Sequence, residues 1–234
     1  MGHEWENRSV GELVLEKPSR SKVFEKAGLD YCCKGQDALG KACQQKGIPV
    51  EELLAALQEM DAKVPEEEDR SWMKDVPTAV EHILRVHHDY TKEALPRLRF
   101  LTGKVAAVHG HEDPRLVELD RAFQAFAQET FDHLAKEEQM LFPMFLALAK
   151  GERWPMPPTV QMPIARMLQE HLQHGENLEL FRTLTDGFVP PPGACNSWRA
   201  LLDGLAELEY DLHRHIHKEN SWLYPAAIEL EARL

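Results

Sequence analysis

Apolar residues recur every three or four positions along four long stretches between Pro77 and the C-terminus. This spacing places them on one face of an α-helix, and that face must pack against another element. The four stripes are Leu84, His88, Thr91, Leu95 and Leu98; Leu119, Phe123, Phe126, Thr130, His133, Glu137, Met140 and Met144; Ile164, Met167, His171, His174, Leu178 and Phe181; and Leu201, Leu205, Leu208, Leu212, His215, Glu219 and Trp222. Strand patterns are weak throughout. The sequence therefore predicts an all-α fold in which these four helices form a bundle, with Pro-rich breaks at 154–158 and 190–193.

The amphipathic stretches in the first part of the chain are shorter. Amphipathic stretches at 10–15 and 23–29 and a helix that starts at Pro49 predict a small helical domain, with the segment Asp-Tyr-Cys-Cys-Lys-Gly at 30–35 between them. Residues 63–70 are acidic, contain a proline and are typical of a linker. We therefore expect two domains, a small helical one at 1–64 and a four-helix bundle at 75–234.

Polar residues interrupt each of the four stripes near its middle. Two stripes carry the same motif, in which Glu follows His by four residues and Pro follows that Glu by six: His133 with Glu137, and His215 with Glu219. Residues four apart lie on the same face of a helix, so each pair can direct one imidazole and one carboxylate to the same point. Burying such groups is costly unless they are paired or bind a metal. The repeated pattern favours a metal site.

The kind of metal follows from the donors. The six residues predicted to face the core are His88, His133, Glu137, His171, His215 and Glu219. Four imidazoles and two carboxylates exceed what one structural zinc ion uses. Carboxylates can bridge, so we predict two metal ions, each with two histidines, bridged by Glu137 and Glu219 and with an open position. Iron is the first choice, with manganese or zinc possible.

Two of these ligands have close competitors. His87 adjoins His88, and His82 is near, but His88 lies on the apolar stripe and is preferred. His171 and His174 share one stripe, so spacing does not separate them.

Other polar residues of the bundle are assigned less central positions. We expect His213 and His217 to be exposed, because they fall off the stripe of the last helix. Glu129 and Glu170 are candidates to support the ligands or relay protons, and a surface position is an equally good interpretation for each.

Composition limits the possible partners and location. The chain has 234 residues and a formal net charge of -12, which argues against a nucleic-acid partner. No apolar run reaches the roughly 20 residues that span a bilayer, and the polar, acidic N-terminus lacks a signal-peptide pattern. We therefore expect a cytoplasmic protein without a membrane partner.

The cysteines add a second candidate site. Cys32 and Cys33 are adjacent, a spacing that strains a disulfide between them, and only Cys43 and Cys195 accompany them. The pair is interpreted either as metal-linked or redox-active thiols, or as small buried residues without chemistry. We predict that both thiols lie near a helix N-terminus, where a thiolate is favoured and alkylation is fast.

Taken together, these motifs resemble the bacterial di-iron family that repairs iron-sulfur clusters (the RIC proteins). The resemblance covers nearly the whole chain. It rests on residues 136–143, on Glu170-His171, on His88-Asp89 followed by 93–96, on 190–195 before Trp198, and on 30–35 followed by Leu39 and Ala42-Cys43. Lys34 stands where the family often has Gly.

The resemblance implies more than the spacing does. It implies a hemerythrin-like bundle with a non-haem centre of two iron ions per chain, and it favours His171 over His174. It also implies a homodimer that acts in the stress response on damaged iron-sulfur proteins, by iron donation, with nitric oxide or oxygen as a small ligand. Cys32 and Cys33 would then be thiol reductants or iron acceptors. Two alternatives stay open: an enzyme that reduces nitric oxide at the di-iron site, and a non-catalytic oxygen or nitric oxide sensor or carrier.

Overall fold

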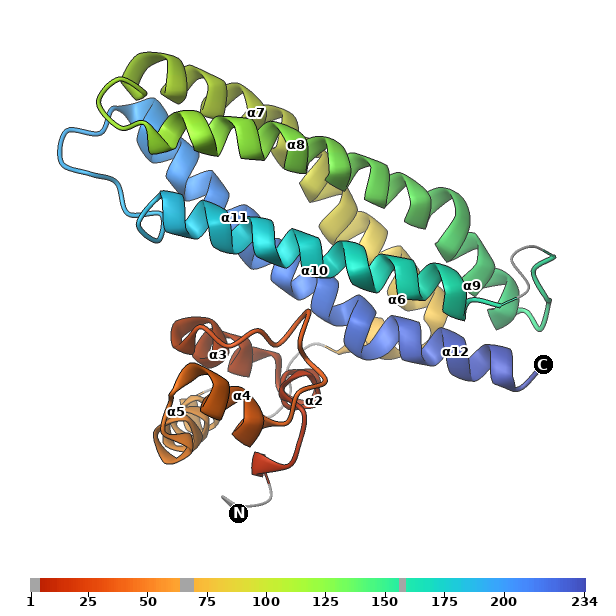
Figure 1. Cartoon of the computed structure of the whole chain (residues 1–234). Coiled ribbons are helices and arrows are strands. Elements are labelled where there is room, and N and C mark those ends of the chain that lie inside the picture. Colours follow the sequence, from red (N-terminus) through yellow and green to blue (C-terminus); the bar gives the residue numbers. More distant parts are fainter. Residues whose placement is uncertain (1–4, 64–69, 156–158) are drawn as a thin grey trace.

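The computed structural model describes residues 5–63, 70–155 and 159–234. Within them the chain is helical, with no β-strand and one isolated bridge between Ser9 and Ala38. The predicted all-α fold, a hemerythrin-like four-helix bundle preceded by a small helical domain, is confirmed (Figure 1). None of the helices in these parts of the chain combines the length and apolarity needed to cross a membrane. Parts of the predicted linker at 63–70 and of the Pro-rich break at 154–158 lie outside the described residues.

Short helices make up the small domain: α2 (Val10–Glu16), α3 (Ser21–Ala27), α4 (Leu39–Lys46) and α5 (Val50–Lys63), with the 3-10 turn η1 (Pro18–Arg20). Ser9 and Glu12 form a reciprocal capping box that starts α2. Gly28 and Gly47 end α3 and α4 at positive φ, which glycine adopts without steric cost. The domain bounds 1–64 and 75–234 stay a prediction.

Four long helical rods lie side by side in the second group (Figure 1). After the 3-10 turn η2 (Ser71–Met73), the first rod comprises α6 (Val76–Ile83), η3 (Leu84–His88) and α7 (Asp89–His109). The second comprises α8 (Arg115–Lys136), η4 (Glu137–Leu141) and α9 (Phe142–Ala149). The third is α10 (Gln161–Leu184), and the fourth comprises α11 (Asn196–Lys218), η5 (Glu219–Leu223) and α12 (Tyr224–Ala232).

Three of the rods contain a π-helical segment where the polar residues interrupt the apolar stripe. In η3, η4 and η5 the closing backbone N–H reaches the carbonyl five residues earlier, as from Phe142 to Glu137 and from Tyr224 to Glu219. The motif prolines, Pro143 and Pro225, come next and have no N–H to donate one turn back. Single π-helical turns of this kind are concentrated at functional sites.

Each π segment adds one residue to a turn and so changes which residues face the core. The α-helical stripe placed Met140 and Trp222 inside. This was wrong for Met140, which is 39% exposed, whereas Trp222 is half-buried and packs against an apolar cluster of the bundle. The next residues in the chain, Leu141 and Leu223, are buried instead. The stripe predicted from a constant period therefore fails by one residue just after each motif glutamate.

Two apolar clusters pack the bundle, one on each side of the polar residues. One cluster lies among α7, α8, α10 and α11 and includes Phe123, Phe126 and Phe181. The other lies among α6, α9, α12 and the start of α10 and includes Phe142 and Phe145. Between them is a polar layer that both clusters shield from water.

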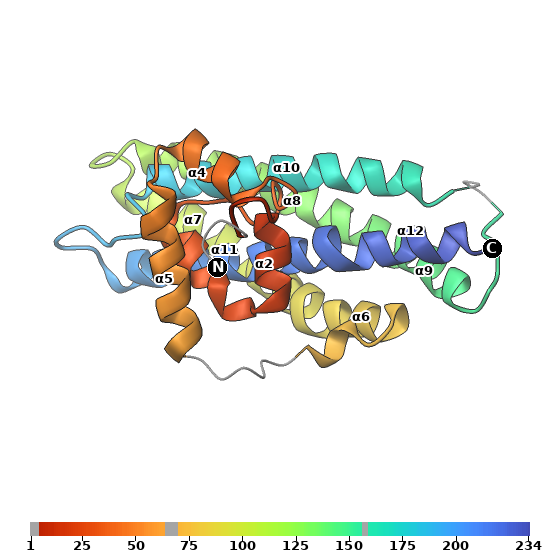
Figure 2. The ribbon, with the colours of Figure 1, turned by 90° about the horizontal axis from the view of Figure 1, so that it is seen from below.

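The small domain packs against the fourth rod (Figure 2). Ile216 joins the apolar cluster of the small domain, and the His217 ring donates from Nε2 to the Gly11 carbonyl at 2.9 Å. The expectation that His217 is exposed was therefore wrong, because the docked domain covers that face of α11; His213 is half-buried. A Cβ on Gly11 would lie 2.8 Å from Ser221 Oγ, so the close approach of α2 requires glycine there.

Candidate metal centre

Six side chains converge in the polar layer: His88, His133, Glu137, His171, His215 and Glu219, each at most 2% exposed. Glu137 and Glu219 are the first residues of η4 and η5, and His88 is the last residue of η3. His133 and His215 lie one turn before the two glutamates, and His171 lies in α10. All four rods therefore contribute to one point, as the interrupted stripes predicted.

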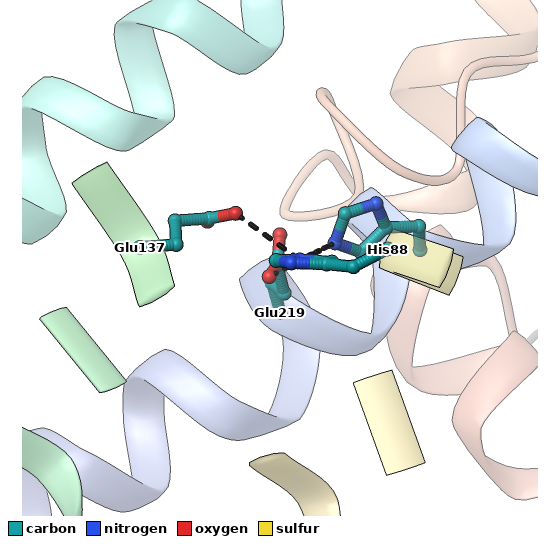
Figure 3. A group of neighbouring side chains, drawn as sticks. His88, Glu137 and Glu219 are labelled. Atoms are coloured by element: carbon teal, nitrogen blue, oxygen red, sulfur yellow. Dashed lines mark hydrogen bonds and ion pairs between the residues drawn. The ribbon is translucent and has the colours of Figure 1, made fainter. Parts of the chain in front are cut away.

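The first group of donors comprises His88, His215 and one oxygen from each glutamate. His88 Nε2 lies 3.2 Å from His215 Nε2 and 3.4 Å from Glu137 Oε2. His215 Nε2 lies 3.1 Å from Glu219 Oε1. Figure 3 shows His88, Glu137 and Glu219 pointing toward one another from three different rods.

The second group comprises His133, His171 and the other oxygen of each glutamate. His133 Nε2 lies 3.1 Å from His171 Nε2 and 3.4 Å from Glu137 Oε1. His171 Nε2 lies 3.2 Å from Glu219 Oε2. Each carboxylate thus presents one oxygen to each group, so Glu137 and Glu219 could each bridge two neighbouring ions if metal were bound.

The buried oxygens of these carboxylates argue for a cation. Glu137 Oε2 and both oxygens of Glu219 are fully buried and form no well-aligned hydrogen bond among the described residues; they face only imidazole nitrogens, at 3.1–3.4 Å. A buried polar atom without a well-formed hydrogen bond costs about 1–3 kcal/mol, and more when it is charged, so a cation between these groups would stabilise the layer. A set of four imidazoles and two carboxylates in two overlapping groups fits two iron ions, and its chemistry also suits manganese or zinc.

Hydrogen bonds on the far side of the rings fix the orientation of three histidines. His88 Nδ1 lies 2.7 Å from Glu138 Oε1, and His133 Nδ1 lies 3.0 Å from Glu170 Oε2. His171 Nδ1 lies 2.8 Å from Asn220 Oδ1. Such partners set the tautomer and increase the basicity of the nitrogen that faces a metal.

The fourth ring, His215, is held differently. Its Nδ1 is buried without a hydrogen-bond partner among the described residues, and the His87 ring stacks on it at 5.3 Å with nearly parallel planes. His87 itself bonds to Asp211 Oδ1 at 2.8 Å and to Lys218 Nζ at 2.8 Å. Burial, with His215 and Lys218 nearby, holds the pKa of His87 far below its usual value, so this ring is neutral.

The electrostatics of the polar layer follow from the paired charges. Burial alone would lower the pKa of His133, but the carboxylates of Glu137 and Glu170 raise it to about 10. Burial would raise the pKa of Glu137, yet His133 and His88 hold it well below its usual value. The His133 imidazole is thus protonated beside Glu137, and a bound metal would replace that proton.

Tyr224 contacts two residues of the polar layer, Glu137 and His171. Its hydroxyl donates to Glu137 Oε1 at 2.7 Å, and its ring stacks on His171 at 5.9 Å. Burial and the two neighbouring glutamates raise the pKa of Tyr224 well above its usual value, so the hydroxyl keeps its proton. The sequence interpretation missed Tyr224, because it follows Glu219 by five residues and shares its face only through the π segment.

The competing histidines are buried but lie outside both donor groups. His174 packs edge-on against Phe126 and His133, and burial holds its pKa well below its usual value. His87 stacks behind His215, as described above. Of the two further acidic candidates, Glu129 is exposed and away from the site, whereas Glu170 supports His133. Glu138 and Asn220 were not singled out; each directly follows a motif glutamate, and that adjacency was the available signal.

Cys32 and Cys33 lie in the loop of residues 28–38, beside α10 rather than in the polar layer. Asp30 Oδ1 accepts hydrogen bonds from both backbone N–H groups, at 3.0 Å and 2.8 Å. The adjacent Cys33 thiol, burial and the Asp30 carboxylate hold the pKa of Cys32 well above its usual value. The predicted reactive thiolate at a helix N-terminus was therefore wrong for Cys32, since α4 begins only at Leu39 and burial disfavours the charge.

The bundle and its converging donors define a hemerythrin-type cation-binding domain, and residues 79–227 match the family described as "Hemerythrin HHE cation binding domain". Residues 6–61 match a second family, described as "Domain of Unknown function (DUF542)". The relatives of the whole chain narrow this class further.

A protein of Pectobacterium atrosepticum named "Iron-sulfur cluster repair protein YtfE" is 36% identical over 229 residues, 97% of this chain and 99% of the relative. The protein of that name from Yersinia pseudotuberculosis is 35% identical, with 97% and 100% covered. A "Probable iron-sulfur cluster repair protein" of Haemophilus influenzae is 34% identical, with 94% and 96% covered. This chain belongs to the iron-sulfur cluster repair family, the RIC proteins.

Proposed function

We propose that this protein repairs iron-sulfur clusters damaged by nitrosative or oxidative stress, and that it does so by donating iron from a centre of two iron ions. The observation that carries the proposal is the pair of overlapping donor groups that share Glu137 and Glu219, with one oxygen of each carboxylate facing each group. Relatives that match over nearly the whole chain, and whose names state cluster repair, support the same role.

The proposed ligands divide between the two ions. His88 and His215 would hold one ion, and His133 and His171 the other, with Glu137 and Glu219 bridging. Two bound iron ions would supply one-electron redox chemistry and open positions for a small ligand. The chain supplies the rest: it fixes the ring orientations through Glu138, Glu170 and Asn220, and the two apolar clusters keep water out.

We propose that iron leaves beside the Cys-Cys loop, the loop of residues 28–38. A cavity of about 920 Å³ is lined by residues of the small domain and of α10 and α11, among them Cys32, Cys33, Glu176 and Glu209. The Cys33 sulfur lies 3.1 Å from the carbonyl oxygen of His171, so a thiol stands next to one ligand of the proposed centre. We propose that Cys32 and Cys33 act here as iron acceptors or reductants during repair.

The test is a repair assay with defined components. The full chain loaded with two irons is mixed with a cluster enzyme inactivated by nitric oxide or peroxide, plus a reductant, and recovery of enzyme activity is followed. The metal-free chain and a chain with Cys32→Ser and Cys33→Ser serve as controls. We expect recovery only with the iron-loaded chain. Equal recovery with the loaded chain, the metal-free chain and no added chain would exclude repair.

A second candidate is reduction of nitric oxide at the same centre. Each donor group provides four protein ligands, which leaves room for a small diatomic molecule at an ion that prefers five or six ligands. Formation of nitrous oxide from nitric oxide and a reductant, in the absence of any damaged cluster, would favour this reaction. A spectral change on adding nitric oxide or oxygen without turnover would favour a sensor or carrier. The homodimer implied by the family is a further proposal, which light scattering of the full chain tests.

A further inference from the structure

His171 differs from the other proposed ligands in what holds it. Its carbonyl oxygen accepts a hydrogen bond from the Cys33 thiol at 3.1 Å. Its ring Nδ1–H donates to Asn220 Oδ1 at 2.8 Å, and the amide nitrogen of Asn220 donates to the Cys32 carbonyl at 3.1 Å. The Cys-Cys loop (residues 28–38) therefore contacts His171 twice, once directly and once through Asn220.

The partners of His88 and His133 belong to the bundle alone. Glu138 is paired with Lys92 at 2.5 Å, and Glu170 is paired with Lys136 at 2.7 Å, so both carboxylates are fixed within the four rods. Asn220 is a neutral amide whose second hydrogen bond ends on the small domain. The orientation of His171 thus depends on where the Cys-Cys loop lies, whereas the orientations of His88 and His133 do not.

The thiol of Cys33 lies close to α10 on one side and faces a cavity on the other. Gly175 lies one turn after His171, and a Cβ built on Gly175 would be 3.2 Å from Cys33 Sγ. Cys33 is half-buried and lines the cavity between the small domain and the bundle, so a reagent can reach its sulfur. Alkylation replaces the thiol proton, so the Cys33 sulfur can no longer donate to the His171 carbonyl, and the loop loses its direct hydrogen bond to α10.

We propose that Asn220 is a positioning residue that makes the hold of His171 on its metal depend on the docked Cys-Cys loop. The proposal rests on the two-iron centre of the proposed function and states what regulates the release of iron from it. Displacing the loop, as by an adduct on Cys33, removes the Asn220 contact with Cys32 and loosens His171. The ion between His133 and His171 is then released before the ion between His88 and His215.

The coupling is reciprocal by thermodynamic linkage. If displacement of the loop weakens the binding of one ion by a given factor, binding of that ion stabilises the docked loop by the same factor. Loading the centre with iron therefore protects Cys33 from alkylation. This second expectation requires no substitution near the site.

The first experiment follows iron release from the full, iron-loaded chain. It uses a Cys195→Ser background, since Cys195 is exposed and would also react. The Cys33 thiol adds across the double bond of N-ethylmaleimide, so no leaving group forms. An iron(II) chelator then reports the release of iron. We expect two phases of equal amplitude and acceleration of one phase by roughly 10-fold, the lower bound for disturbing the partner of a metal ligand. Acceleration of neither phase, or of both phases equally, would overturn the proposal.

Substitutions at Asn220 separate its two contacts. Asn220→Leu removes both, so it should accelerate the same phase without any adduct. Asn220→Asp keeps an acceptor for His171 but has no donor for the Cys32 carbonyl, so release of this ion should be faster than in the parent chain and should no longer respond to N-ethylmaleimide. Glu138→Gln is the matched control: it should accelerate the other phase, that of His88, whatever the state of Cys33. A response of Asn220→Asp to the adduct as large as that of the parent chain would contradict the proposal.

The second experiment measures alkylation of Cys33 in the iron-loaded and the metal-free chain, with the modified residue identified by peptide mass spectrometry. We expect roughly 10-fold slower alkylation in the loaded chain, the factor expected for release. Equal rates would overturn the coupling even if an Asn220 variant failed to fold. Neither experiment contains a damaged cluster, so failure of the repair assay would remove the proposed function and leave these outcomes unaffected.

Discussion

Replacing His171 and His174 separately by alanine tests the site most sharply, because both rings are buried three residues apart on α10. His171 Nε2 lies 3.2 Å from Glu219 Oε2, inside one donor group. The His174 ring instead packs against Phe126, with ring centres 5.6 Å apart. His171→Ala should therefore lower iron content, and His174→Ala should lower stability.

The two substitutions should change different quantities, the iron content for His171→Ala and the free energy of unfolding for His174→Ala. His171→Ala removes one of the four residues that form its donor group, so iron content after dialysis against a chelator should fall from two ions to about one. The loss of affinity should exceed the roughly 10–100-fold that loss of a ligand's supporting partner causes. His174→Ala leaves a cavity beside Phe126 and should cost about 2–3 kcal/mol, as other large-to-small core substitutions do. For a chain of this size that corresponds to a Tm lower by roughly 5–10 °C.

The assay combines iron quantification with thermal unfolding of each variant, both loaded and metal-free. His87→Ala and His88→Ala repeat the contrast on the first rod, where only His88 lies in a donor group. Iron loss confined to the His174 and His87 variants would refute the assignment of His171 and His88.

Three further outcomes follow from the same contacts. Glu219→Ala should weaken both ions at once, because each of its oxygens faces a different donor group; loss of a single ion measured by iron quantification would contradict bridging. Tyr224→Phe removes the hydrogen bond to Glu137 and should destabilise the metal-free chain by about 1–2 kcal/mol in urea unfolding, and unchanged stability would show that the bond contributes nothing. Backbone N–H groups at the start of α11 and the His109 ring lower the pKa of the exposed Cys195 thiol. The thiolate therefore persists to lower pH than in an ordinary cysteine, and His109→Gln should shift the pH midpoint of alkylation upward; an unchanged midpoint would exclude this role of His109.

The sequence predicted the bundle and the convergence of its polar residues because these depend on helical period alone. Residues at spacings of three and four share a face, so the interruptions at His88, His133, His171 and His215 had to meet if the four helices packed together. Spacing did not separate His171 from His174, because both lie on the buried face of α10 and differ in where their rings point.

What could not be predicted depends on the break in that period and on the docking of the second domain. A π segment shifts the following residues by one position, so Leu141 and Leu223 are fully buried where a constant period predicted Met140 and Trp222. The burial of His217 results from contacts with Gly11, more than two hundred residues earlier, which no local pattern reports. The adjacent Cys33 thiol is the main cause of the high pKa of Cys32 and is local, but the burial that adds to it is tertiary and is not visible in the sequence pattern.

The two apolar clusters on either side of the polar layer have a consequence for the turnover of the protein in a cell. Each half of the bundle has its own core, and the halves are joined across a layer of buried carboxylates and imidazoles. A bound ligand raises stability according to its concentration relative to its dissociation constant, and proteases remove chains in proportion to the time spent open. With metal bound as proposed, the polar layer joins the two halves of the bundle. Without metal, the bundle opens at this layer. Iron supply would then set not only how many chains can act but how long each one survives.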